Sequence, residues 1–244
     1  MILQARMGST RLPGKSLMPL AGEPLVLRIL ERVSRCTTLD AIVLATTKTP
    51  ADDALAALGR EYGVCVFRGS ENDLVDRHRE AAREVKADVI VRLPADNPVP
   101  EPEEIDRIVR YHRTGAAEFS SNLSPMLGNG YPDGIGAEVF NADALEWVWR
   151  TVSDPERREH PHLNFFDYKT QQAAEPTRFR VGTVQCPEAF RRPDLRLDVN
   201  TADDYAFMAE LYSALYSNNP TFHITDIIAW YSSRPRLARV EHQR

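Results

Sequence analysis

The sequence predicts an α/β fold with a mostly parallel sheet and helices on both of its faces. Short apolar runs alternate with longer amphipathic runs through the first 120 residues. This alternation makes four strand-then-helix units, which is typical of parallel strands joined by right-handed crossovers. The length of 244 residues fits a single domain of this class.

The strand–helix units follow one another directly in the first half, residues 1–120. Met1–Ala5 predicts a strand that enters a loop rich in Gly and Pro, and Pro24–Cys36 carries apolar residues at helical spacing. The segment before Gln4 is short for a strand, which leaves open a start upstream of Met1. The other expected strands are Ala41–Thr47, Val64–Phe67 and Asp88–Leu93, and the other expected helices are Asp52–Tyr62, Asp73–Lys86 and Pro102–Arg113.

The regular alternation of expected strands and helices stops in the second half, residues 121–244. Five Gly and Pro residues crowd positions 128–136, and no linker separates the halves, so we expect one domain over 1–244. The three tryptophans lie in apolar helical patterns, and at least two are expected to pack in the core. The expected strands here are Ala137–Phe140, Arg178–Val184 and Leu195–Val199, and the expected helices are Ala142–Val152, Ala202–Tyr216 and Ile224–Ser232.

Composition excludes several classes of protein. With 30 Lys+Arg against 35 Asp+Glu, the formal net charge of −5 argues against a nucleic-acid partner. The longest apolar runs have about five residues, too few for membrane insertion, and the N-terminus is charged where a signal peptide is apolar. Three cysteines without metal spacing are typical of a reducing compartment, so we expect a cytoplasmic protein. Arg6, Arg11 and Lys15 nevertheless gather in the first fifteen residues without an acidic neighbour.

The loop Gly8–Ser16 reads GSTRLPGKS and follows the first expected strand. Its glycines, hydroxyls and two cations suit a loop that wraps a polyphosphate, although a surface turn with incidental charge is the alternative. It is not a Walker A loop, because Gly8 and Gly14 enclose five residues instead of four and the helix starts late. A dinucleotide-binding G-x-G-x-x-G is also absent.

The string ILQARMGSTRLPGKSL resembles the opening motif of cytidylyltransferases that activate sugars as CMP derivatives. The chain is most similar to the SpsF-like family of spore-coat polysaccharide biosynthesis, which is related to the acylneuraminate and 3-deoxy-manno-octulosonate cytidylyltransferases. The resemblance implies a Rossmann-like (GT-A-like) nucleotidyltransferase fold and spans almost the whole chain. The further matching motifs are ATT (45–47), RGSENDLVDR (68–77), VRLPADNPV (91–99), YPDGIGAEVF (131–140), REH (158–160) and LRLDVNTADD (195–204).

The resemblance implies that CTP reacts with an acceptor, giving a CMP conjugate and pyrophosphate, with Mg²⁺ as cofactor and a homodimer as the assembly. Arg11, Lys15 and Asp96 would be catalytic, with the two cations on the triphosphate. The acceptor would be a sugar acid, a sugar-like molecule or a phosphonate, bound in the second half by Asp133, Glu138, Arg158 and His160. The expected nucleotide-binding residues are Gln4, Ala5, Arg6, Gly8, Ser9, Thr10, Arg11, Lys15, Ala45, Thr46, Arg68 and Asp96.

Asp96 and Asp198 are the expected metal ligands. Asp96 follows an apolar strand, at the end where open α/β sheets bind ligands, and Mg²⁺ prefers few carboxylates plus phosphate oxygens. A turn or helix-capping Asp is the alternative for Asp96. The SpsF-like pattern has its Asp at the position of Asn200 and a Thr at the position of Asp198, so we expect Asp198 to replace the family carboxylate while Asn200 orients a water. Capping of the next helix is the alternative for both.

Two other functions stay open at this stage. One is a glycosyltransferase of similar fold that uses a nucleotide sugar, although the mid-chain motif ADNP lacks the usual D-x-D. The other is a nucleotide-binding protein with a decayed site, for which Asn200 is the best evidence. The spacing E-H-P-H at 159–162 is not expected to bind metal, because Pro161 interrupts a helix and no third ligand follows.

Overall fold

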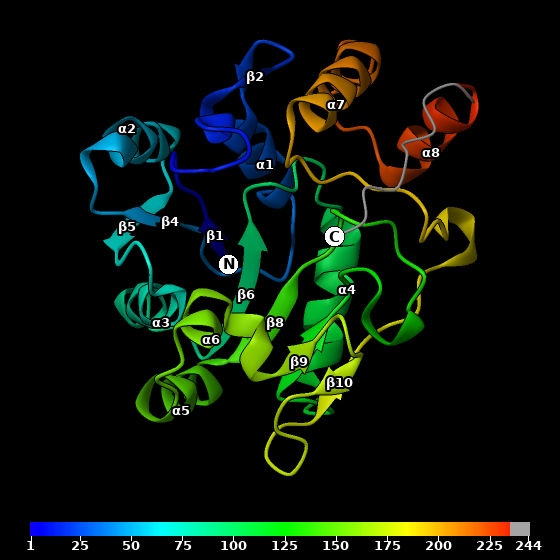
Figure 1. Cartoon of the computed structure of the whole chain (residues 1–244). Coiled ribbons are helices and arrows are strands. Elements are labelled where there is room, and N and C mark those ends of the chain that lie inside the picture. Colours follow the sequence, from blue (N-terminus) through cyan, green and yellow to red (C-terminus); the bar gives the residue numbers. More distant parts are fainter. Residues whose placement is uncertain (235–244) are drawn as a thin grey trace.

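A computed structural model describes residues 1–234 of the chain. Its seven-stranded sheet has the order β11-β7-β8-β6-β1-β4-β5, and Figure 1 labels the strands β8, β6, β1, β4 and β5. Only the pairs that β8 makes with β6 and β7 are antiparallel, so the sheet is mixed and mostly parallel, as predicted. The strands are β1 Ile2–Gln4, β4 Val43–Thr47, β5 Cys65–Gly69, β6 Val89–Pro94, β7 Phe119–Ser121, β8 Glu138–Asn141 and β11 Val181–Gly182.

Helices cover both faces of the sheet, because successive strand residues point to opposite sides. On β1, Leu3 joins one buried cluster with the helices α1, α2, α4, α7 and α8, while Ile2 joins a second cluster with α3 and α5. The predicted two-sided arrangement is therefore confirmed. The helices are α1 Leu25–Val33, α2 Asp53–Tyr62, α3 Leu74–Glu84, α4 Pro102–Arg113, α5 Ala142–Thr151, α6 Pro155–Glu159, α7 Ala202–Leu215 and α8 Ile224–Ser232.

Short elements complete the described chain. Two small hairpins pair β2 (Pro19–Leu20) with β3 (Glu23–Pro24) and β9 (Phe166–Asp167) with β10 (Gln172–Ala173). Within residues 1–234, no helix combines the length and the apolar character that crossing a bilayer requires. Single 3-10 turns occur at Lys15–Leu17, Pro50–Asp52, Met126–Gly128, Pro161–Asn164 and Glu188–Phe190.

Two of the expected strands are wrong or too long. Leu195–Val199 forms no strand, because its backbone bonds go to two different loops: the Leu197 N–H donates to Asp133 O and the Val199 N–H to Asp96 O. Arg178–Val184 shortens to β11, since only Val181 and Gly182 pair with β7. β7 was not expected from the sequence, because its three residues are too few to show a periodic pattern.

The start of α7 is capped by its own residues. The Thr201 hydroxyl accepts from the Asp204 N–H, and the Asp204 carboxylate accepts from the Thr201 N–H, which is a complete capping box. This excludes the alternative in which Asp198 and Asn200 cap the helix. Glu101 holds the N-cap position of α4, so Asp96 is not a helix cap either.

Candidate active site

The carboxyl ends of three neighbouring strands define one edge of the sheet. Gln4, the last residue of β1, pairs with Ala45 of β4 on one side and with Pro94 of β6 on the other. Loops that leave these strands therefore begin side by side, above the sheet in Figure 1. The segment 195–200 reaches the same edge, where the Val199 N–H donates to Asp96 O over 2.7 Å. This is the edge at which open α/β sheets bind ligands.

The loop after β1 is closed on itself by backbone hydrogen bonds. Met7 O accepts from the N–H groups of Ser9, at 2.9 Å, and Gly14, at 3.0 Å. Gly14 has a φ of 74°, a left-handed conformation that favours glycine, and Lys15 begins the next 3-10 turn. The first long helix starts only at Leu25. The geometry thus differs from a Walker loop, which runs directly into its helix.

Asp52 anchors this loop, a role that sequence reasoning missed. Its carboxylate is buried and accepts from the Met7 N–H, at 2.7 Å, and from the N–H and hydroxyl of Thr47. Burial opposes ionisation of Asp52, but these hydrogen bonds outweigh it and hold the pKa of the carboxyl below its usual value. The ionised Asp52 therefore ties the loop after β1 to the end of β4. Asp52 was expected as the first residue of the helix Asp52–Tyr62, and that position gave no signal for this role.

Lys15 and Asp96 meet across this edge. The Lys15 ammonium lies 3.8 Å from Asp96 Oδ2 and donates to Val199 O at 2.7 Å. Burial lowers the pKa of Lys15, while the negative charge of Asp96 works in the opposite direction. The ammonium is thus held between the Asp96 carboxylate and the Val199 carbonyl. Lys15 belongs to the loop Gly8–Ser16, which is expected to contact a ligand's phosphates.

Arg11 is linked to the expected second carboxylate through Asn200. Arg11 Nη2 donates to Asn200 Oδ1 at 2.7 Å, and the Asn200 amide donates to Asp198 Oδ2. Arg196 bonds Asp198 at 3.2 Å from the other side and lies 3.6 Å from Asp133. Asp133 was expected on the acceptor side, and the structure places it beside the Asp198 segment.

Asp96 and Asp198 suit a magnesium ion that is completed by a nucleotide. Residues 1–234 contain no group of three or more His, Cys, Asp or Glu side chains that could hold a metal by itself. The Lys15 ammonium lies 3.8 Å from Asp96 and donates to the carbonyl of Val199, the residue after Asp198, so the segments that carry the two aspartates meet at one side chain. Mg²⁺ usually takes one or two protein carboxylates and completes its shell with phosphate oxygens and water. The two oxygen donors present fit that preference.

Comparisons with known proteins show which family the chain belongs to. The cytidylyltransferase family model matches residues 1–220. The SpsF protein of Bacillus subtilis, described as a spore coat polysaccharide biosynthesis protein, is 34% identical over 97% of this chain and 95% of its own length. The chain belongs to the cytidylyltransferase family. It is therefore a CTP-dependent nucleotidyltransferase, and the predicted resemblance is confirmed.

Two further relatives extend the comparison for this cytidylyltransferase. A 3-deoxy-manno-octulosonate cytidylyltransferase of Chlorobium chlorochromatii is 28% identical over 90% of this chain and 77% of the relative. The solved structure of a cytidylyltransferase from Leptospira borgpetersenii superposes with a TM-score of 0.85 at 28% identity, over 100% of this chain and 97% of that one. The nucleotidyltransferase fold expected from the resemblance is thus confirmed.

A buried polar network lies below the edge in the cytidylyltransferase. Arg92 of β6 donates to the Gln4 side chain at 2.9 Å and to Glu138 of β8, and Tyr168 also donates to Glu138. Burial opposes ionisation of Glu138, but the charge of Arg92 holds its pKa below the ordinary value. Glu138, expected on the acceptor side, is therefore an ionised group that is locked between Arg92 and Tyr168. Arg92 lies in the matching motif VRLPADNPV (91–99) but was not expected at the site, and Tyr168 lies in none of the matching motifs.

The segment that holds α6 lies beside the loop after β1. Arg6, in the loop after β1, lies 3.7 Å from Glu159 at the end of α6, and both side chains are partly exposed. His160 follows, is exposed, and lies beside His162 with 5.9 Å between the ring centroids. Burial lowers the pKa of His162 to about 4, so this imidazole is neutral near pH 7. The expected acceptor residue His160 thus directly follows Glu159, which contacts the loop after β1.

Two expected binding residues have their nitrogens engaged within the chain. Arg68 donates to the carbonyls of Thr47 and Thr49, both at 2.8 Å, and pairs with Asp53. Arg158 pairs with Asp73 and donates to the carbonyls of Trp149 and Val152. Arg68 therefore stabilises the loop after β4, and Arg158 stabilises the position of α6.

The remaining expected nucleotide-binding residues lie at the edge as well. Ala5 donates its N–H to Ala45 O at 3.1 Å, which continues the pairing of β1 with β4. Thr46 is buried, and its hydroxyl has no hydrogen-bond partner in the described chain. Gly8 and Thr10 are exposed at the tip of the loop.

Proposed function

We propose that this cytidylyltransferase transfers CMP from CTP to a sugar acid, a sugar-like molecule or a phosphonate, with release of pyrophosphate and dependence on Mg²⁺. The observation that carries the proposal is the meeting of Lys15 with Asp96 at the edge where β1 and β6 end. The loop supplies cations for a free triphosphate, and Asp96 supplies a carboxylate for a metal. A nucleotide with its magnesium needs both on one edge.

The reaction needs no covalent nucleophile on the protein. The acceptor oxygen attacks the α-phosphorus in line, and the bond from that phosphorus to the pyrophosphate oxygen breaks. Arg11 and Lys15 act on the leaving pyrophosphate, whose developing charge they offset. Asp96 and Asp198 would hold Mg²⁺, which when bound would supply further neutralisation of the phosphate oxygens. Positioning and electrostatics provide the rate in such transfers.

Asn200 has a distinct role in this proposal. Its amide oxygen receives Arg11 and its amide nitrogen contacts Asp198, so the side chain connects a phosphate-binding cation with a metal-binding carboxylate. A carboxylate at position 200 could not donate to Asp198. The neutral amide therefore favours Asp198 as the second ligand, with Asn200 orienting Arg11 and a metal-bound water.

The acceptor is proposed to enter between the loop after β1 and α6. Arg6 and Glu159 approach each other there, and His160 lies exposed on the same rim. Glu138 is buried and paired with Arg92, so its contribution is to fix the shape and the charge of the protein beneath the acceptor. An acceptor with an anionic group would find Arg6 at this rim, which agrees with the proposed acceptor classes.

Pyrophosphate release from CTP tests the proposal. The wild type is incubated with CTP, Mg²⁺ and a panel of sugar acids, sugars and phosphonates, and Asp96→Asn is the matched control. Release that depends on both an acceptor and Asp96 supports cytidylyl transfer. Tight CTP binding without release over the whole panel would instead support a non-catalytic nucleotide-binding protein, and turnover of a nucleotide sugar without pyrophosphate would support a glycosyltransferase.

A further inference from the structure

A pocket of about 590 Å³ opens at the amino edge of the parallel strands, opposite the proposed active site. One of its lining residues, Asp143, lies two positions after Asn141, the last residue of β8. Asn141 pairs with Val89, the first residue of β6. Glu118 directly precedes β7 and Phe179 shortly precedes β11, so both lie at that same edge. Lys15 and Asp96 follow the other ends of the strands. The pocket is therefore no part of the nucleotide or acceptor site.

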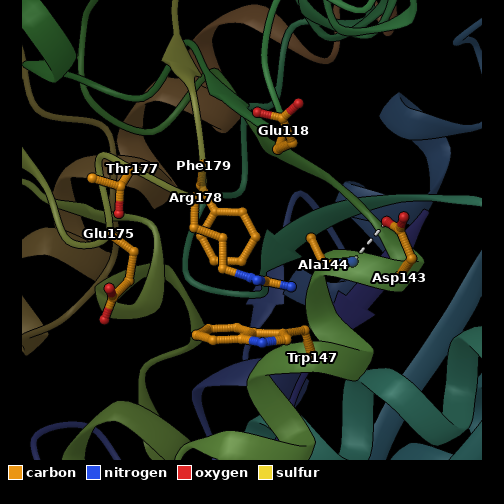
Figure 2. A pocket seen from close by; sticks show the side chains of 8 residues that line it. All are labelled: Glu118, Asp143, Ala144, Trp147, Glu175, Thr177, Arg178 and Phe179. Carbon is orange, nitrogen blue, oxygen red and sulfur yellow. Dashed lines mark hydrogen bonds between the residues drawn. The ribbon is translucent and has the colours of Figure 1, made fainter.

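An indole face forms one wall of this pocket, and a guanidinium covers it. The Arg178 Cζ atom lies 4.0 Å from the ring centroid of Trp147, and Figure 2 shows the guanidinium flat above the indole. Phe179 packs edge-on against the same indole with 5.4 Å between centroids. Within residues 1–234, the Arg178 side chain has no ion pair or hydrogen bond, and its contacts are with aromatic rings. The indole therefore presents its face to a cation from within the chain.

Three carboxylates surround this aromatic wall, as Figure 2 shows. Glu118 is bonded by Arg180, and Glu175 lies 3.6 Å from Arg157. Asp143 accepts the Ala144 N–H at 2.7 Å and has no ion pair in the described part of the chain. Arg180 and Arg157 offset the charges of Glu118 and Glu175, so Asp143 is the carboxylate that would repel an anionic ligand. A cation on the indole would instead gain the field of Asp143 together with the attraction of the ring.

We propose that this pocket binds an organic cation, an ammonium or guanidinium group, on the Trp147 face that Arg178 covers. Arg178 sits on an exposed segment and holds its place by stacking alone, so a ligand of the same chemistry can replace it. The carboxylate of Asp143 then faces the incoming nitrogen, and the Arg178 head group moves into water. The exchange forms and breaks no covalent bond.

Calorimetric titration of the full chain with agmatine tests the exchange. Arg178→Ala removes the competing guanidinium and is expected to bind agmatine about fivefold more tightly than the wild type, since an arginine–tryptophan contact contributes on the order of 1 kcal/mol. Asp143→Asn is expected to bind it about threefold more weakly, which corresponds to a partly exposed charge pair. Lys169→Ala, another exposed cation, should match the wild type.

A capped arginine tripeptide identifies the source of the cation. Tighter binding of the tripeptide than of agmatine assigns the pocket to a protein side chain, and the reverse order assigns it to a free amine. If Arg178→Ala binds agmatine no better than the wild type, or if neither binds it, the proposal is wrong and Arg178 only packs. Arg178→Ala should keep wild-type pyrophosphate release, because the pocket and the active site lie at opposite edges.

Discussion

Lys15 and Asp96 face each other over 3.8 Å, although one lies in the first loop and the other follows the strand β6. The same ammonium donates to the carbonyl of Val199, which brings in a third segment of the chain. One side chain thus connects the three segments that carry the proposed phosphate cations and metal ligands. We therefore expect activity to depend on the Lys15 ammonium more than on exposed lysines elsewhere in the chain.

Replacing Lys15 by Ala removes a charge that opposes the developing negative charge on pyrophosphate. We expect kcat to fall about a hundredfold, because the charge acts in a partly buried site. Steady-state pyrophosphate release measures the loss. Lys169→Ala removes an exposed lysine of the β9–β10 turn and should leave kcat unchanged. Full activity of Lys15→Ala would exclude the proposed role of the loop.

Exchanging Asp198 and Asn200 tests which position binds the metal. Asp198→Asn alone is expected to lower kcat/KM about a hundredfold at limiting Mg²⁺, since a metal ligand contributes several kcal/mol of charge stabilisation. The double variant Asp198→Asn/Asn200→Asp restores a carboxylate two residues along and should recover part of this loss. Titration of activity with Mg²⁺ gives the half-saturation for each variant. An unchanged magnesium dependence in Asp198→Asn would show that Asp198 is not a ligand.

Removing the Asp52 carboxylate is expected to loosen the loop after β1. Asp52→Ala leaves the N–H of Met7 and the N–H and hydroxyl of Thr47 without their acceptor, so the free energy of unfolding should fall by about 3 kcal/mol. KM for CTP should rise as well. The neighbouring Asp53 is mostly exposed, and Asp53→Ala should change stability by less than about 0.5 kcal/mol. Urea unfolding of both variants measures the difference, and equal losses would contradict the anchoring role.

His162 makes stability depend on pH. Burial lowers its pKa from 6.5 to about 4, so the unfolded chain binds a proton that the folded protein excludes. The contribution of this shift to the free energy of unfolding is fully present above pH 6.5. As the pH falls towards 4, the free energy of unfolding decreases by about 3 kcal/mol. His162→Gln should flatten this part of the profile, whereas His160→Gln, at an exposed ring, should not. Urea midpoints measured from pH 4 to pH 7 test this, and parallel profiles for wild type and His162→Gln would be inconsistent with it.

Elements with a long periodic pattern could be predicted from the sequence, and short ones could not. α4 was predicted as Pro102–Arg113, the range that it occupies. β7 has three residues, and Leu195–Val199 reads as a strand although its partners are loop carbonyls. A local pattern of apolar residues indicates burial, and a buried strand and a buried loop segment share it. The pattern does not indicate which groups the backbone bonds.

Motifs single out the loop Gly8–Ser16 and Asp96 as candidate site residues, which stay predictions, but they do not single out the residues that contact this part of the fold. Asp52, Arg92 and Tyr168 act through contacts with residues far away in the sequence, and such pairs leave no local signature. Arg158 carried a motif, yet in the fold it pairs with Asp73 at the start of α3. The homodimer and the cytoplasmic location expected from the sequence stay predictions.

Thermal unfolding with CTP, UTP, GTP and ATP, each with and without Mg²⁺, tests the central claim most directly. A ligand that binds only the folded protein stabilises it by about 2.7 kcal/mol at a hundred times its Kd. We therefore expect CTP with Mg²⁺ to raise the Tm by several degrees, the other nucleotides to raise it less, and Asp96→Asn to lose the magnesium-dependent part. No shift with any nucleotide, or the same shift in Asp96→Asn combined with Lys15→Ala, would contradict a CTP–magnesium site at this edge.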